Sequence, residues 1–250
     1  MTRWLTIGAA LVVLSAAGNV FAQASAAGAS QVAPGAAAAS VAPSAAAAPA
    51  ARVRPPLFFS EGWQPLKTPP DDHGAWPASQ SGVASPTLEL SLHGASGKEI
   101  QLVAVRGQSD LYPMNLWTGT TTSPSAASLR DRDNFVDLSD PLAKIRWTVR
   151  TSGFHQVRPI IKLADGTWLI GDHATGPSVD FNIDDISIAD VRWMKLDIDR
   201  VVTVGDWVAN PDLRKVDEVG FADLIPGSGH GPGGYANVTR IEVYGRPVKR

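Results

Sequence analysis

The sequence predicts an all-β protein, an antiparallel β-sandwich or jelly roll of about eight strands that follows a disordered N-terminal tether. Two observations predict this class. Between residues 56 and 250, almost every apolar stretch is short, alternates with period two and ends at Gly, Pro, Asp or Ser, which is typical of strands. Helical periodicity is scarcely visible there. A parallel α/β fold needs a helix between strands, and none of the connections offers one.

The composition excludes several classes of protein. The chain has 250 residues and no cysteine, which excludes disulfide scaffolds, cysteine nucleophiles, thiolate zinc sites and a lipid-modified N-terminal cysteine. Residues 1–55 contain three arginines and no acidic residue, which leaves 19 basic and 24 acidic residues for the rest of the chain. This excess of five negative charges disfavours a nucleic-acid partner.

Residues 1–22 have the pattern of a signal peptide. Arg3 provides a positive start, an apolar run follows, and small residues precede Gln23, where a signal peptidase would cleave. The run is too short and too often interrupted for a membrane anchor. Residues 23–55 are predicted to be a disordered linker, because their prolines interrupt any alanine-driven helix. We therefore expect export to the periplasm or the medium, no membrane contact after cleavage, and a sandwich domain over residues 56–250.

The predicted strands are, in chain order, 87–93, 100–105, 145–149, 160–163, 167–170, 192–198, 216–222 and 238–244. Residues 100–105 follow a glycine-containing turn and are expected to pair with 87–93. The apolar faces of their strands place Trp147 and Trp168 in the core. The long segments 65–85 and 109–128 are predicted to be loops, because they are rich in Pro, Ser, Thr and Gly.

The dipeptide Asp165-Gly166 suits a tight hairpin that pairs Leu163 with Trp168. In the strand 192–198, Met194 and its period-two neighbours are predicted to face the core. This leaves Trp193 on the polar face.

The C-terminal third carries a resemblance to a known family. The residues VDEVGF at 216–221, then a glycine-rich loop, then VTRIEVYG at 238–245 resemble the closing segment of galactose-binding-like jelly rolls. The earlier Asp137-Leu138-Ser139 is also similar to the pattern of that group. Many of these domains are non-catalytic carbohydrate-binding modules, so the resemblance implies a secreted protein that binds a carbohydrate. It also implies a structural calcium ion, for which Glu61 and Glu242 are the nominated ligands.

Glycan binding needs flat apolar faces with hydrogen-bonding groups nearby. Trp193 is the first platform candidate, and the glycine-rich loop displays two further side chains. A polar group in the middle of the chain adds to them, with Arg158 and Lys162 on one strand face; the alternative is a solvated sheet face. The candidate ligand-binding residues are Trp193, Arg158, His155, Asp172, His173, His230 and Tyr235.

Metal and catalytic sites are weakly indicated. His155, His173 and Asp172 would supply nitrogen and oxygen ligands, but their spacing matches no compact metal motif, so a metal is left open. No catalytic residue is assigned. One enzyme alternative stays open, a glycoside hydrolase in which Glu218 and Glu242 face each other on neighbouring strands. The other alternative is a structural or adhesion domain of the cell envelope.

Overall fold

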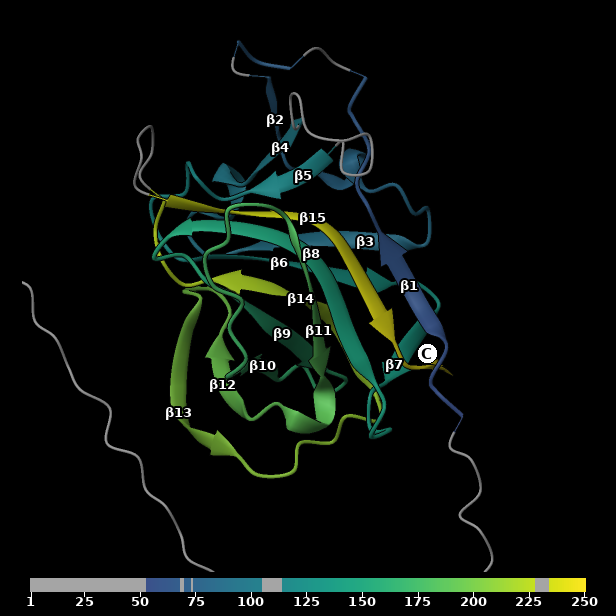
Figure 1. The fold of residues 1–250 in the computed structure, drawn as a ribbon. Coiled ribbons are helices and arrows are strands. Elements are labelled where there is room, and N and C mark those ends of the chain that lie inside the picture. The colour runs from purple at the N-terminus through teal and green to yellow at the C-terminus, as the bar shows by residue number, and fades with distance from the viewer. Residues whose placement is uncertain (1–52, 68–69, 73, 105–113, 228–233) are drawn as a thin grey trace, which may run out of the picture. The chain divides into compact units, whose positions relative to one another are not determined.

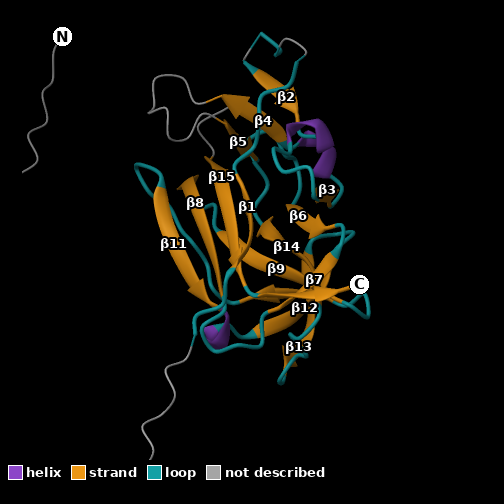
Figure 2. Ribbon diagram, turned by 90° about the vertical axis from the view of Figure 1, so that its right-hand side faces the viewer, coloured by secondary structure: helices purple, strands orange, loops and turns teal. Residues whose placement is uncertain are grey.

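The computed structural model describes residues 53–67, 70–72, 74–104, 114–227 and 234–250, and these lie in the compact unit Ala51–Arg250. Most of the expected signal peptide and linker therefore lies outside the described residues. Two antiparallel sheets face each other, with β8 and β15 of one sheet in front of β9 and β14 of the other in Figure 1. The three 3-10 turns, η1 (Gln80–Gly82), η2 (Gly97–Glu99) and η3 (Ile188–Asp190), are the helical segments of Figure 2. No helix among the described residues has the length and hydrophobicity to cross a membrane.

The seven-stranded sheet has the order β11-β8-β15-β5-β4-β2, and β1 pairs with β15 beside this path. Its strands are β1 (Leu57–Glu61), β2 (Ala75–Pro77), β4 (Gln101–Ala104), β5 (Met114–Trp117), β8 (Lys144–Gly153), β11 (Asn182–Ser187) and β15 (Gly234–Tyr244).

The nine-stranded sheet has the order β13-β12-β10-β9-β14-β6-β3, with β7 and β16 paired beside β14. Its strands are β3 (Leu88–His93), β6 (Ser125–Asp131), β7 (Asn134–Asp137), β9 (Val157–Leu163), β10 (Trp168–Gly171), β12 (Trp193–Asp197), β13 (Val202–Val208), β14 (Val216–Asp223) and β16 (Arg246–Lys249).

The main core fills the space between the two sheets. Alternate residues of β8, among them Trp147, are fully buried, and they pack in one cluster with Phe221 of β14 and Trp193 of β12. Burying side chains of this size contributes about 1.5–3 kcal/mol each. The outer face of the nine-stranded sheet, turned away from the other sheet, carries a second apolar cluster that includes Ile160 and Leu196. Part of this face is therefore also buried.

The predicted fold class is confirmed, and all eight predicted strands are present. The described residues contain sixteen strands, eight more than the prediction gave. The segments 65–85 and 109–128, predicted as loops, contain β2, β5 and the start of β6. The β6 sequence SAASLRD has a loop-like composition, yet six of its seven residues are buried. Small residues covered on both faces give no period-two signal.

Two predicted pairings are wrong. β4 does not pair with β3; it pairs with β2 and β5 in the seven-stranded sheet, while β3 pairs with β6. The chain crosses between sheets after Gly94, whose φ of +84° permits the sharp turn. Alternation indicates which face a strand buries but not which strand lies beside it.

The β9–β10 hairpin has a different register from the predicted one. Trp168 lies opposite Lys162 rather than Leu163, and the Leu163 backbone N–H donates to the Thr167 carbonyl. Gly166, at a φ of +89°, allows the longer turn. A slip of one residue moves side chains to the other face, so Trp168 lies half-buried on the outer face instead of in the main core.

Candidate functional site

A pocket lies at the edge of the nine-stranded sheet, beside β12 and β13. We name it the edge pocket. It has a volume of about 510 Å³. Its lining residues are Ser139, Ile188, Ala189, Val191, Arg192, Trp193, Trp207, Val208, Ala209, Asn210, Pro211 and Leu213. The lining is mostly apolar, with a few polar groups, as is typical of small-molecule sites.

The position of β13 explains why a pocket forms here. β13 is the last strand of its sheet, so no further strand covers its side. The chain leaves it through Asn210, at a φ of +49°, a backbone conformation in which asparagine is enriched. The chain then reaches Leu213, whose carbonyl accepts the Leu138 backbone N–H at 2.9 Å. This bond joins two loops that line the pocket.

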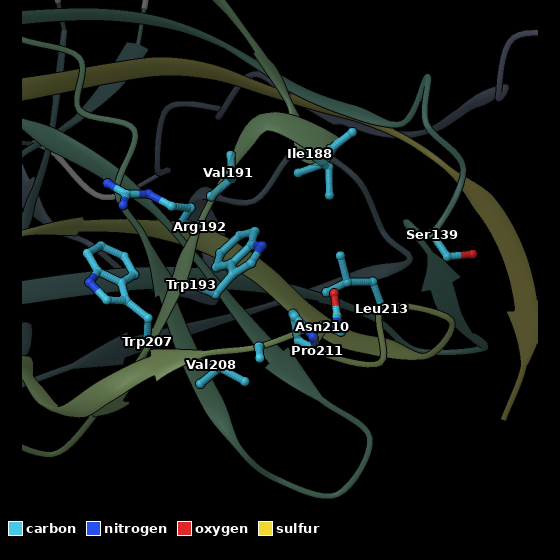
Figure 3. A pocket seen from close by; sticks show the side chains of 12 residues that line it. Ser139, Ile188, Val191, Arg192, Trp193, Trp207, Val208, Asn210, Pro211 and Leu213 are labelled. Carbon is cyan, nitrogen blue, oxygen red and sulfur yellow. The ribbon is translucent and has the colours of Figure 1, made fainter.

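Two tryptophans line the edge pocket from different faces of the sheet. Trp193 is opposite Val208, and Trp207 is opposite Met194. Trp193 is only 2% exposed and belongs to the main core, whereas Trp207 is 47% exposed. Trp193 is therefore a buried wall of the pocket and not the exposed platform that the polar face of its strand suggested. Figure 3 shows Arg192 and Trp207 on one side of Trp193, and Asn210, Pro211 and Leu213 on the other.

Arg192 is held firmly beside Trp207. Its guanidinium carbon lies 4.6 Å from the centre of the Trp207 ring, within the range of a cation–π contact. Asp172 accepts from the Arg192 backbone N–H at 2.9 Å and from Nε at 2.7 Å. The Asp172 backbone N–H donates back to the Arg192 carbonyl at 3.0 Å. Burial acts to raise the pKa of Asp172, but the hydrogen bonds from Arg192 outweigh it, so the pKa is lowered and the carboxylate stays charged.

The other predicted site residues are dispersed. His155 is fully buried; its Nδ1 donates to Asp223 at 2.7 Å, while its Nε2 has no hydrogen-bond partner among the residues that the structure describes. His173 Nε2 bonds to Asp184 at 2.8 Å. Arg158 lies half-buried on β9, on the face it shares with Lys162, and Tyr235 contacts the ring of Trp117 on the seven-stranded sheet. His230 lies outside the described residues.

The structure does not bring the nominated metal ligands together. His155, Asp172 and His173 are each bound to a different partner. In the described part of the chain, no three His, Asp or Glu side chains are grouped so that they could hold a metal ion.

The calcium nominees do not fit the ion either. The buried Glu61 carboxylate accepts backbone N–H groups from Trp63, Ala84 and Ser85. Its partner across the strands is Ile241, the neighbour of Glu242, so the two glutamates project from opposite faces. Glu242 instead accepts the hydroxyl of Tyr244.

The carboxylate pair of the hydrolase alternative is contradicted. Glu218 belongs to β14 in the nine-stranded sheet, whereas Glu242 belongs to β15 in the seven-stranded sheet, so the two strands are not neighbours. Glu218 Oε2 accepts the hydroxyl of Ser128 at 2.5 Å, and its Oε1 accepts Lys162 Nζ at 2.8 Å. The motifs placed both glutamates on final strands but did not show that the chain changes sheet between them.

The sequence analysis did not select Arg192, Asn210 or Trp207 as candidate ligand-binding residues. The hydrophobic pattern contains no signal that β13 is an edge strand. An isolated tryptophan in a polar stretch, Gly205-Asp206-Trp207, was the available hint.

No protein-family model matches the chain. No curated protein matches it. Among solved structures, it is similar to the Family 11 carbohydrate-binding module of a cellulosomal cellulase of Clostridium thermocellum, with a TM-score of 0.42, 15% identity and coverage of 69% of this chain and 95% of that chain. A Family 29 carbohydrate-binding module in complex with cellulohexaose has a TM-score of 0.36, 12% identity and coverage of 70% and 94%.

An exo-beta-agarase has a TM-score of 0.34 and 11% identity, with coverage of 66% of this chain and 24% of the agarase. The resemblance to carbohydrate-binding modules indicated by the C-terminal motifs is thus also found by structural comparison. The TM-scores of these three structures are below 0.5, so what these proteins bind is not transferred to this chain.

Proposed function

We propose that this protein is a non-catalytic carbohydrate-binding protein that holds a sugar in the edge pocket. The observation that carries the proposal is the half-exposed ring of Trp207 beside a fixed cation in a pocket that is otherwise mostly apolar. A tryptophan face that is exposed to water leaves a large apolar surface unburied. A sugar ring placed against it would recover part of that burial, while Arg192, Asn210 and Ser139 hydrogen-bond its hydroxyl groups.

The absence of acids from the pocket lining supports a binding role. Glycoside hydrolysis needs two carboxyl groups beside the scissile bond, and none of the twelve lining residues is Asp or Glu. The proposed task is therefore recognition without bond cleavage.

A glycan array with the full-length chain tests the proposal. We expect binding to at least one glycan and a loss of about tenfold or more in Trp207→Ala, in line with the weight of single aromatic anchors. Phe154→Ala is the matched control, because Phe154 is 84% exposed and is not among the residues lining the pocket. The proposal fails if no glycan binds, which would leave the structural or adhesion alternative, or if Trp207→Ala binds as well as the parent.

We also propose that the protein is exported, on the pattern of residues 1–22. Mass spectrometry of protein recovered from the periplasm or medium should find an N-terminus near Gln23. An intact Met1 in that material would contradict the proposal.

A further inference from the structure

We infer that the edge pocket selects an acidic sugar, a hexuronate whose carboxylate pairs with Arg192. This inference rests on the proposed function, because it names the class of sugar for the same pocket. It follows from the charge of the lining, from the way Arg192 is held, and from the kinds of hydrogen-bonding group that the pocket offers.

The charge of the lining is the first step. Arg192 is the sole charged residue among the twelve that line the edge pocket. Its side chain is 71% exposed, so the guanidinium stays accessible at the mouth. Asp172 already pairs with Nε of Arg192, so a negative ligand group would meet the terminal amino groups that Asp172 leaves open.

The fixed position of Arg192 is the second step. Asp172 accepts a hydrogen bond from Nε of Arg192, and the ring of Trp207 lies against the guanidinium. No described residue makes a hydrogen bond or ion pair with the two terminal amino groups of Arg192. They form an edge of two parallel donors, which matches the two oxygens of a carboxylate. Because the side chain is already ordered, little conformational entropy is lost when the ligand binds.

The balance of donors and acceptors is the third step. Each hydroxyl group of a neutral sugar donates as well as accepts, so a site for neutral sugars needs acceptors. The lining offers no carboxylate. Arg192 only donates, Asn210 donates and accepts, and the Ser139 hydroxyl already donates to Asp137 at 2.6 Å, so it can only accept from a ligand. Because Arg192 only donates, the ligand group placed against it must accept, which a carboxylate does with both oxygens.

Matched pairs of oligosaccharides test the inference on the full-length chain. Each pair consists of a uronate oligosaccharide, such as trigalacturonate or triglucuronate, and its carboxyl-reduced neutral counterpart. We expect the uronate of at least one pair to bind about tenfold or more tightly, as expected for one charge-assisted pair. Its affinity should fall between 50 and 500 mM NaCl more than that of the neutral partner.

Variants of Arg192 complete the test. In Arg192→Gln the preference should shrink to about twofold or less, and Arg192→Lys should keep only part of it, since a point charge lacks the bidentate edge. Arg240→Gln, an arginine on the seven-stranded sheet, should leave the preference unchanged. Circular dichroism confirms that each variant is folded.

Two results separate this inference from the proposed function. If a neutral sugar binds as well as its uronate and Trp207→Ala abolishes that binding, the acidic-sugar inference fails while the proposed function stands. If neither member of any pair binds, and the glycan array is also empty, both fail.

Discussion

The ring of His93 on β3 meets the ring of Trp168 on β10 edge to face, with 4.9 Å between their centroids, although three strands separate β3 from β10. In a flat sheet, four strand spacings would place these strands about 19 Å apart. The outer face of the nine-stranded sheet must therefore be strongly curved. Between the two rings, β6 and β14 carry the small residues Ser128 and Gly220 opposite each other.

Gly220 shows how tight this curvature is. A Cβ atom at this position would lie 2.0 Å from the carbonyl oxygen of Ala127 on the neighbouring strand. Strand backbones cannot give way as a side chain can, so any larger residue must push β14 and β6 apart.

We predict that Gly220→Ala lowers the free energy of unfolding by about 3 kcal/mol, because the added methyl group overlaps backbone. Urea unfolding measures the change. Gly176→Ala is the control, since its Cβ would meet no atom within 4 Å, and it should change stability by less than about 0.5 kcal/mol. Equal effects of the two substitutions would show that the curvature does not require a glycine.

Trp193 and Trp207 should differ in their contribution to stability. Trp193→Ala removes a fully buried ring from the main core and should cost about 3–5 kcal/mol. Trp207→Ala removes a half-exposed ring and should cost less than about 1 kcal/mol. Thermal or urea unfolding of both variants measures these losses of stability. A large loss of stability in Trp207→Ala would show that this ring has a structural role.

His93 should make the protein less stable in mild acid. The Ser128 hydroxyl donates to Glu218, so it accepts the Nε2–H of His93 at 2.9 Å. Burial lowers the pKa of His93; Glu218 and Asp199 act to raise it, and Lys162 to lower it. As pH falls below 6.5, the unfolded chain takes up a proton that the folded His93 resists, so stability is lost.

The free energies of unfolding at pH 7 and pH 5 should therefore differ more in the parent than in His93→Gln. The comparison isolates His93 from the other four histidines, which are the same in both proteins. Identical pH profiles of parent and variant would refute the prediction.

Asp185 should stabilise the fold at neutral pH through Arg146. Arg146 Nε and Nη2 each donate to the Asp185 carboxylate at 2.7 Å. These bonds lower the pKa of Asp185 to about 2. Burial acts to raise this pKa, and Lys144 acts to lower it further. A lowered carboxylate pKa adds stability above the unfolded value of 3.8, and this stability is lost as pH falls toward 2.

Since the pair is partly exposed, solvent screening limits the expected loss in Asp185→Asn to about 0.5–1 kcal/mol at pH 7. The difference from the parent should vanish near pH 2 and shrink in 1 M NaCl, as followed by thermal unfolding. A difference in stability that persists at pH 2 would show that packing, and not the ion pair, causes it.

The candidate site could be predicted only in part. A search for exposed tryptophans pointed to Trp193, and its strand does line the edge pocket, but the ring lies on the buried side. The alternation in β12 correctly showed that Met194 and Leu196 share an apolar face. This face was predicted to lie in the main core, but it packs into the second cluster on the outer face. When both faces of a strand are covered, the sequence pattern does not distinguish them.

The sequence by itself determined the fold class, the strands with clear alternation and the burial of Trp147. These features depend on local periodicity and on the hydrophobicity of the side chains. Only the tertiary structure decided which strands are neighbours, in which sheet Glu218 and Glu242 lie, and that Arg192 stacks on Trp207 at a sheet edge. These relationships join residues that are distant along the chain or depend on sheet order. Their free energy appears only when both partners are in place, so no local pattern encodes them.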